Sequence, residues 1–367
     1  MQSREDRRLR YIDSLRAIAA MLVLWVHVSE LFESVASAGS SWVHALTLPI
    51  NAGRIGVVLF FAISGFVIPF SIKLAHRFPV REFLLTRFFR LYPAYWLSVP
   101  LGVVTTYWIW NSPYPASAFF VNLTMLEYLF DVPPAIGLYW TLAFEFVFYV
   151  CCVILVLTGN ITRYRRIGAL AFGLIALHIA MAPLSHGSLY NVSFWPLNIG
   201  VMFWGTLYRA EMLGLANGIF ERVCLWGTVV LLVVVYPNLL TLYLGIPYAN
   251  MIPYSIAILL FIAGTRIVRL EFAPLPWLGL ISYSIYLFHP VVFNPLLRFI
   301  QSTPSDGWLR HWHLGAYVVV VLLLTIGVAA LIYYTIERPS IRLGRRLAKR
   351  WFGEPDPTPA PAVATLA

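Results

Sequence analysis

The stretch YIDSLRAIAAMLVLWVHVSELF, from Tyr11 to Phe32, is long enough to cross a bilayer as one helix. It carries Arg16 near its start and His27 deep inside it. Eleven residues make about three helical turns, so the two side chains lie on one helix face about 16 Å apart. An ionisable residue inside a membrane span is costly and usually functional. The stretch therefore predicts a membrane helix that carries part of a functional site.

The composition places the chain among polytopic membrane proteins. Of its 367 residues, 60% are hydrophobic and 11% are charged, which soluble globular proteins do not show. Further apolar runs, bounded by charges or by clusters of Pro, Gly and Asn, bring the predicted transmembrane helices to about ten. We expect an all-α fold with spans at 14–33, 52–72, 83–108, 139–158, 167–184, 194–209, 220–241, 249–265, 276–298 and 313–337.

The distribution of basic residues predicts the orientation of these spans. With the N-terminus in the cytoplasm, only Arg54, Arg298 and Arg310 of the 26 Lys and Arg residues fall on the outer side, which leaves 23 on the inner side. This asymmetry is typical of the positive-inside rule. We therefore expect both termini in the cytoplasm. The net charge of +10 reflects this membrane topology, so we expect no nucleic-acid partner.

The predicted domain organisation is a cytoplasmic segment at 1–13, one transmembrane domain at 14–342 and a cytoplasmic tail at 343–367. The tail ends in GEPDPTPAPAVATLA, whose Pro and Ala content is typical of partial disorder. The basic start and the first apolar run resemble a signal peptide. The length of the run and its acidic and histidine side chains favour an uncleaved first span.

The three cysteines, Cys151, Cys152 and Cys224, all lie within apolar runs. This placement favours simple packing over a disulfide framework. No cluster of residues has the spacing of metal ligands, so we expect no metal.

Arg87 and Arg90 open the third predicted span from its inner side. They are three residues apart and project from neighbouring positions on one helix face. As interfacial anchors they would meet lipid phosphates. As a binding pair they would hold a phosphorylated cytosolic ligand, because arginine offers planar bidentate donors. The residues alone leave both interpretations open.

Glu145 and His27 are each about six residues from the outer end of their predicted spans. That places both at a depth of about 9 Å. We hypothesise that His27 is a base and that Glu145 is the carboxylate that orients it. The alternative is a Glu145 that is buried against an unrelated hydroxyl.

Two further polar positions lie inside spans. Ser64-Gly65 lies in the middle of the second span, where small residues favour close helix packing or a kinked backbone that lines a cavity. His289 precedes Pro290 in the ninth span, and we expect a structural histidine bonded to a backbone carbonyl that the proline frees. Glu337-Arg338-Pro339 closes the last span, where we expect local charge pairing.

Five segments in this order resemble the acyltransferase 3 family of integral membrane O-acyltransferases, from Tyr11 to about Arg342. They are IDSLRAIAAMLVLWVH with its Arg16-to-His27 spacing, FFAISGF at 60–66, RFFRLYP at 87–93, WTLAFEFVFY at 140–149 and ISYSIYLFHP at 281–290.

The resemblance implies transfer of an acyl group, most often acetyl, from cytoplasmic acyl-CoA to a hydroxyl, commonly on a glycan. It implies His27 as the catalytic histidine, Arg16 as its motif partner, and Arg87 with Arg90 at the acyl-CoA. Glu145 matches the acidic position of the fourth-span motif. Many family members have two adjacent acidic residues there, whereas phenylalanines flank Glu145.

Ser64, Tyr149 and His289 are candidates for substrate contact or structural support within these motifs. Many relatives that modify surface glycans carry a C-terminal extracytoplasmic domain, which we do not expect here. Transfer would then finish within the membrane domain or pass to a separate protein.

We therefore expect a multi-pass enzyme of a bacterial inner membrane, with membrane lipids and a glycan or lipid-linked saccharide as partners. The rival hypothesis is a transporter or flippase, in which the same side chains line a polar path. Direct transfer and a covalent acyl-enzyme on His27 both stay open. Aromatic residues of the 109–138 connection are typical of interfacial anchors, and they also provide surfaces on which sugar rings stack.

Overall fold

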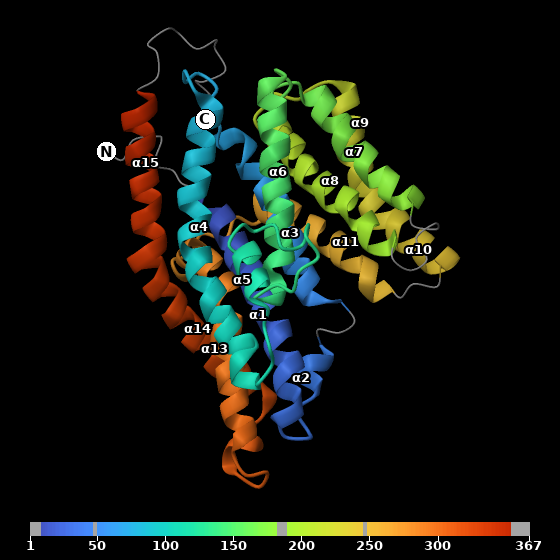
Figure 1. Cartoon of the computed structure of the whole chain (residues 1–367). Helices are drawn as coiled ribbons and strands as arrows, with labels where there is room; N and C mark the ends of the chain where they lie inside the picture. Colours follow the sequence, from blue (N-terminus) through green and yellow to red (C-terminus); the bar gives the residue numbers. More distant parts are fainter. Residues whose placement is uncertain (1–8, 47–49, 182–188, 245–247, 354–367) are drawn as a thin grey trace.

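The computed structural model describes residues 9–46, 50–181, 189–244 and 248–353. In these ranges the chain forms helices joined by turns and loops, without a strand, so the predicted all-α class is confirmed (Figure 1). The α-helices are α1 (Arg10–Phe32), α2 (Trp42–Ala45), α3 (Ala52–Val67), α4 (Pro79–Thr106), α5 (Ala116–Asn122), α6 (Trp140–Leu157), α7 (Tyr164–Met181), α8 (Leu189–Met212), α9 (Ile219–Val230), α10 (Tyr236–Leu244), α11 (Tyr248–Ile262), α12 (Pro274–Leu280), α13 (Ser282–Ser302), α14 (Leu314–Ile332) and α15 (Arg338–Phe352).

Short helical segments connect or extend several of these helices. Among the described residues, three are π-helical and continue the preceding α-helix, and five are 3-10 turns. The π-helical segments are η7 (Leu231–Val235), η8 (Ala263–Ile267) and η10 (Tyr333–Glu337). The 3-10 turns are η2 (Glu33–Val35), η3 (Pro69–Ser71), η4 (Trp108–Trp110), η5 (Gly137–Tyr139) and η9 (Trp308–Arg310).

A helix lies in each of the ten predicted ranges, but fewer helices meet a strict membrane criterion. Within the described residues, six helices are long and apolar enough to cross a bilayer, or seven if α12 and α13, bent by 74°, form one span. The predicted ranges that do not meet the criterion are 83–108, 194–209 and 249–265. In the first of them, α4 has 28 residues, about 42 Å of helix, and its hydropathy is lowered by polar side chains that face the interior.

The helices α1 and α3 form the centre of the bundle. In their most apolar windows, 56% and 72% of the residues are buried, against 28–39% in the other candidate spans. Leu15, Ala19 and Val23 of α1 pack into one apolar cluster, whereas Leu24 and Val28 pack into a second cluster with α13 and α14. Because α1 is buried on two faces, the polar side chains of its middle part, residues 13–29, lie partly or fully inside the protein.

Glycines let α3 approach its neighbours closely. A Cβ on Gly56 would lie 2.5 Å from the Ala19 carbonyl oxygen of α1, and a Cβ on Gly65 would lie 1.8 Å from the Met202 carbonyl oxygen of α8. The packing interpretation of Ser64-Gly65 therefore holds for Gly65, while Ser64 lines a cavity.

The remaining helices flank this centre (Figure 1). The helices α7 to α11 gather on one side, and α13, α14 and α15 gather on the other, next to α4. The boundary that we expect at residue 342 falls inside α15, which continues to Phe352. The Pro- and Ala-rich end of the tail lies outside the described residues.

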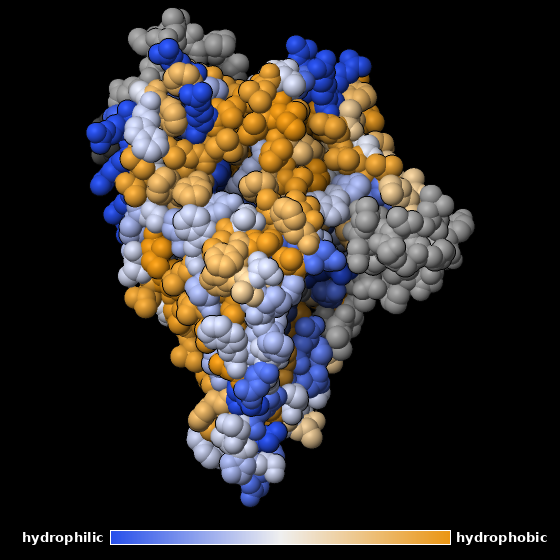
Figure 2. All heavy atoms as spheres, in the orientation of Figure 1, coloured by the Kyte–Doolittle hydropathy of each residue, from blue (hydrophilic) through white to orange (hydrophobic). Residues whose placement is uncertain are grey.

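The surface is that of a membrane protein. On the face in Figure 2, apolar residues cover much of the sides, and hydrophilic residues gather at the upper end and at the lower tip. Exposed apolar side chains include Leu157 (73% exposed) and Val230 (53% exposed), both on candidate spans. Side chains of this kind are stable in contact with lipid.

Candidate active site

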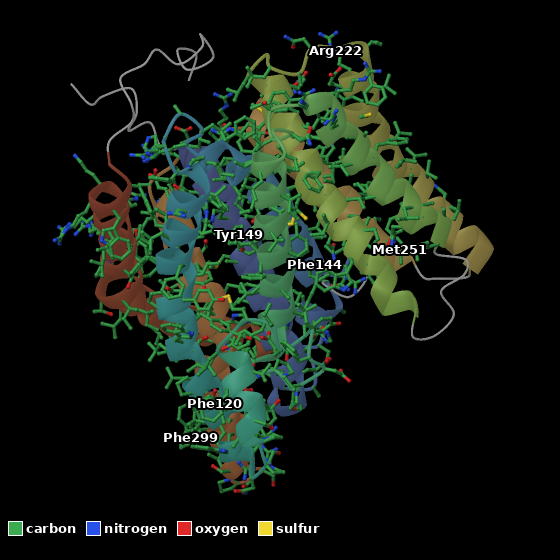
Figure 3. The ribbon with its side chains drawn as sticks, turned by 45° about the horizontal axis from the view of Figure 1, so that its top comes forward. Phe120, Phe144, Tyr149, Arg222, Met251 and Phe299 are labelled. Atoms are coloured by element: carbon green, nitrogen blue, oxygen red, sulfur yellow. The ribbon has the colours of Figure 1, made fainter. Side chains whose placement is uncertain are left out.

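A polar cavity lies inside the bundle, between α1, α3, α4, α6 and α13. It brings together most of the predicted site residues: Arg16, Ser64, Arg87, Arg90 and Glu145. Tyr149 lies one turn from Glu145 on α6, which Figure 3 shows with Tyr149 and Phe144 labelled. We call this space the arginine cavity.

Arg87 is held by one hydroxyl and two aromatic rings. It donates a hydrogen bond to Ser71 Oγ. Its guanidinium lies 5.3 Å from the centre of the Phe83 ring and 5.5 Å from the centre of the Tyr149 ring. Cation–π contacts of this kind fix the plane of the guanidinium, so its remaining N–H groups have a defined direction at the cavity wall.

Arg90 is fixed by a buried carboxylate. Its Nη1 lies 2.7 Å from Glu337 Oε1, and the Glu337 side chain is fully buried. The other oxygen of Glu337 accepts a hydrogen bond of 2.7 Å from Ser284 Oγ. The expected local pairing of Glu337 with Arg338 is therefore wrong, because the π-helical segment η10 turns Glu337 toward α4 and α13 and not along its own helix.

Glu145 belongs to the arginine cavity and not to His27. Its Oε1 accepts a hydrogen bond from the Tyr149 hydroxyl, four residues along α6. It also lies close enough to Arg16 and Arg90 to interact with both electrostatically. The hypothesis that Glu145 orients His27 is wrong, because the side chain that contacts His27 Nδ1 is that of His289.

The partner of His27 is His289. His27 Nδ1 lies 3.2 Å from His289 Nε2, and the two rings meet edge to edge, with an interplanar angle of 16° and centroids 5.4 Å apart. His289 is 1% exposed, whereas His27 is only partly buried. The two histidines come from α1 and α13, which pack along each other.

The hydrogen bonds define the proton positions of the neutral pair. His289 Nδ1 lies 3.1 Å from the Ile285 carbonyl oxygen, and a carbonyl only accepts, so His289 Nδ1 carries the proton. His289 Nε2 is then an acceptor, and His27 Nδ1 donates to it. The lone pair of His27 is left on Nε2, where a general base needs it.

The expected role of His289 is therefore met only in part. One ring nitrogen bonds to the backbone carbonyl of Ile285, four residues back, and the ring also interacts with the backbone carbonyl of Tyr286. The Tyr286 carbonyl is the one whose usual donor Pro290 lacks, so the expected carbonyl is among the partners of His289. The second ring nitrogen faces His27, which a purely structural histidine does not require.

Tyr286 lies between the arginine cavity and the histidine pair. It lines the cavity, and its ring centre is 6.1 Å from that of His289. Its hydroxyl lies 2.7 Å from Thr141 Oγ1 and donates to the Leu138 carbonyl oxygen at 3.2 Å. The cavity therefore ends one helical turn of α13 from His289.

Several residues of this site were not predicted from the sequence. They are Glu337, Tyr286, Thr141 and Ser282. Ser282 Oγ is buried at the cavity and has no hydrogen-bond partner among the described residues, so it is available to a ligand. The sequence feature that could have identified Glu337 is its position at the end of a predicted span, because a carboxylate that is buried there needs a partner.

In the described part of the chain, no group of three His, Cys, Asp or Glu residues is placed to hold a metal ion. The cysteines are free thiols, and Cys152 and Cys224 are buried.

Comparisons with known proteins find one family model and two named relatives. A family model described as an acyltransferase domain matches residues 9–334. A protein named as a membrane-bound transacylase, BcsY of Komagataeibacter xylinus, is 27% identical over 91% of this chain and 83% of its own length. The acyltransferase MdmB of Streptomyces mycarofaciens is 25% identical over 92% of this chain and 93% of its own length. No solved structure matches.

The apolar helices and these comparisons together define a multi-pass membrane enzyme that transfers acyl groups. The chain belongs to the acyltransferase 3 family, whose model covers nearly all of it.

Proposed function

We propose that the protein transfers an acyl group, most simply acetyl, from cytoplasmic acyl-CoA to a hydroxyl of a glycan or lipid-linked saccharide in the inner membrane of a bacterium. The observation that carries the proposal is the position of Tyr286 and His289 on one helix. Tyr286 lines the arginine cavity. His289 lies one turn further along α13, where its ring contacts the ring of His27. A site for an anionic donor thus adjoins a site for a base.

Arg16, Arg87 and Arg90 are proposed to attract the donor. Three guanidiniums line a cavity whose carboxylate, Glu145, also bonds to Tyr149, so the cavity favours an anionic ligand. The Phe83 and Tyr149 rings and the Glu337 carboxylate hold Arg87 and Arg90 in place before the donor binds. Such preorganisation reduces the entropy lost on binding.

His27 is proposed to act as the general base. Its Nε2 takes the proton of the acceptor hydroxyl while the oxygen attacks the thioester carbonyl. The C–S bond then breaks, and the proton returns from His27 to the departing thiolate of CoA. The products are an ester and free CoA, and no other reactant is needed. A positioned base of this kind contributes about 10²- to 10⁴-fold to the rate.

His289 is proposed as a positioning residue for His27. Its hydrogen bond holds the His27 ring in one orientation and in the form that leaves Nε2 basic. Ser282, with its unpartnered hydroxyl, is a candidate donor to the carbonyl oxygen of the acyl group.

The proposed topology places the arginine end of α1 toward the cytoplasm and α2 toward the outside, as the distribution of basic residues predicts. The aromatic side chains of the 109–138 connection then lie on the acceptor side. Phe120, Tyr128 and Phe130 are each at least half exposed, and Figure 3 shows Phe120 at the opposite end of the molecule from Arg222. These rings provide surfaces on which sugars can stack.

The test is donor consumption by membranes that contain the protein. Membranes with and without the protein receive acetyl-, propionyl- or palmitoyl-CoA labelled in the acyl group, and both free CoA and alkali-labile label are measured. We expect protein-dependent release of CoA that matches the label transferred, with acetyl preferred. A transporter would consume no acyl-CoA and would leave the acylation of its solute unchanged.

A further inference from the structure

One end of the arginine cavity is closed by side chains from three helices. On each helix, a polar residue of the cavity lining is followed about one turn away by a second lining residue. These pairs are Ser64 and Phe60 on α3, Glu145 and Thr141 on α6, and Ser282 and Tyr286 on α13. The second members, Phe60, Thr141 and Tyr286, contact one another and form one layer, which we call the end wall.

The contacts within the end wall hold Tyr286 in place. Its ring meets the Phe60 ring edge to face, with centroids 5.8 Å apart and an interplanar angle of 75°. Its hydroxyl lies 2.7 Å from Thr141 Oγ1, and both hydroxyls lie within 3.2 Å of the Leu138 carbonyl oxygen. The Tyr286 ring is therefore fixed by a ring on α3 and by polar contacts with α6 and η5.

Phe60 lies where the two apolar clusters of the protein meet. Its side chain packs against both clusters, is partly buried and lines the cavity. On the far side of the end wall, the ring of His289 lies 6.1 Å from that of Tyr286. A group that enters from the arginine end therefore meets Phe60 and Tyr286 before it meets the histidine pair.

The two ends of the cavity differ in polarity. The guanidiniums and Glu145 lie at one end, whereas the apolar side chains of Val57 and Leu142 line the cavity beside the end wall. Val57 is 8% exposed and Leu142 is 6% exposed, so neither has much room to move. This end suits a small apolar group, because close-packed side chains give way only at a cost in free energy.

We propose that the end wall limits the donor to short acyl groups, with acetyl preferred to butyryl, and that Phe60 sets this limit. The inference rests on the proposed function and deepens it, because it names the class of donor. The thioester carbonyl has to approach His27, whose partner His289 lies directly behind Tyr286. Any carbon atoms beyond that carbonyl then lie against the end wall.

A longer acyl chain would have another way out of the cavity, sideways between α3 and α6. Phe61 lines the cavity there, and its ring lies 5.6 Å from the ring of Phe144. Phe60 is the better candidate, because its contact with Tyr286 lies on the side of the histidine pair. The two routes are separated by replacing each phenylalanine in turn.

The chain offers variants that change the end wall in opposite directions. Phe60→Ala shortens the wall, Phe60→Leu shortens it less and keeps more of the packing, and Phe60→Trp extends it. Leu59→Ala is the matched control, because Leu59 is a fully buried neighbour on α3 that does not line the cavity. Membranes with each protein receive equal amounts of acetyl-CoA and butyryl-CoA together, with a different label on each acyl group. The measurement is the ratio of the two labels in alkali-labile product, which does not depend on the amount of folded protein.

We expect the wild type to favour acetyl over butyryl. Phe60→Ala should lower this ratio by at least about tenfold, because one methylene in an apolar pocket changes specificity about 10- to 200-fold. Phe60→Leu should lower it less, Phe60→Trp should raise it, and Leu59→Ala should keep the wild-type ratio. Loosened packing alone would move the ratio in the same direction in Phe60→Ala, Phe60→Trp and Leu59→Ala.

An unchanged ratio in Phe60→Ala and Phe60→Leu, or a shift in the same direction in Phe60→Ala and Phe60→Trp, would overturn the proposal. So would equal transfer of acetyl and butyryl by the wild type. A shift in Phe61→Ala as large as that in Phe60→Ala would also overturn it, because the chain would then leave between α3 and α6. If wild-type membranes transfer neither acyl group, the proposed function itself fails, and that result is distinct from the others.

Discussion

His27 and His289 come from helices α1 and α13, 262 residues apart in sequence, and meet with 3.2 Å between Nδ1 and Nε2. The bond from His289 Nδ1 to the Ile285 carbonyl oxygen gives the pair a direction. His27 Nδ1 donates to His289 Nε2, and His289 Nδ1 donates to the Ile285 carbonyl oxygen. The free lone pair is therefore on His27 Nε2. In the proposed function, His27 is the base and His289 holds it in position.

Replacing His289 should impair the chemical step. His289→Phe keeps a buried ring but removes the acceptor for His27 Nδ1, so we expect kcat to fall about 10- to 100-fold, as for other residues that orient a catalytic group. His289→Gln keeps an amide oxygen near the position of Nε2 and should recover much of this loss. The measurement is kcat and donor KM for each variant.

A merely structural His289 would give another pattern. Both variants would then lower the thermal stability and the activity together, and His289→Gln would bring no selective recovery of kcat. Equal kcat values for His289→Phe and wild type would contradict the positioning role.

The Arg90–Glu337 pair should show unequal costs. Arg90→Gln leaves a fully buried carboxylate without its cation, and removing one partner of a buried pair typically costs about 3–5 kcal/mol. Glu337→Gln should cost less, because the Arg90 side chain is 21% exposed and can reach water. Thermal unfolding in detergent of the single variants and of the double variant measures this difference. A larger loss for Glu337→Gln than for Arg90→Gln would contradict it.

Arg87 should act on the donor and not on stability. Arg87→Lys keeps the charge but loses the planar guanidinium that lies over the Phe83 and Tyr149 rings. We expect donor KM to rise about tenfold, the scale of one charge-assisted hydrogen bond. Arg81→Lys, at an exposed position outside the arginine cavity, is the control. An unchanged KM in Arg87→Lys would remove Arg87 from the donor site.

Gly65 should be irreplaceable where α3 meets α8. In Gly65→Ala the Cβ would lie 1.8 Å from the Met202 carbonyl oxygen, and overpacking of this kind costs about 1–3 kcal/mol or more. Gly173→Ala places its Cβ in open space on α7 and should be neutral or slightly stabilising, because Ala favours helix. The measurement is the unfolding temperature of each variant, compared with that of the wild type. A Gly65→Ala protein as stable as wild type would refute the close contact.

The all-α fold and the gathering of most site residues were predictable from the sequence. Helical periodicity placed Arg16 on one face of its helix, and the distribution of basic residues placed Arg16, Arg87 and Arg90 at the same side of the membrane, where they line one cavity. These predictions depend on the position of each residue along its own span. Physical rules for single helices are sufficient for them.

The pairing of side chains across helices was not predictable in the same way. Equal predicted depth suggested Glu145 for His27, but Glu145 lies within electrostatic reach of Arg16, which is three turns of α1 away from His27. The depth estimated from the predicted span ends was therefore wrong, and His289 is the side chain that meets His27. Glu337 was missed for a related reason, because the π-helical segment η10 changes the direction of its side chain.

The central claim is that His27 is the base for transfer from acyl-CoA. The direct measurement is label transfer from acetyl-CoA in membranes that contain equal amounts of wild type, His27→Ala or His311→Ala. His311 is an exposed histidine outside the site. We predict equal labelling with wild type and His311→Ala, and a rate lower by about 10²- to 10⁴-fold with His27→Ala. Labelling by His27→Ala at the wild-type rate would contradict the claim.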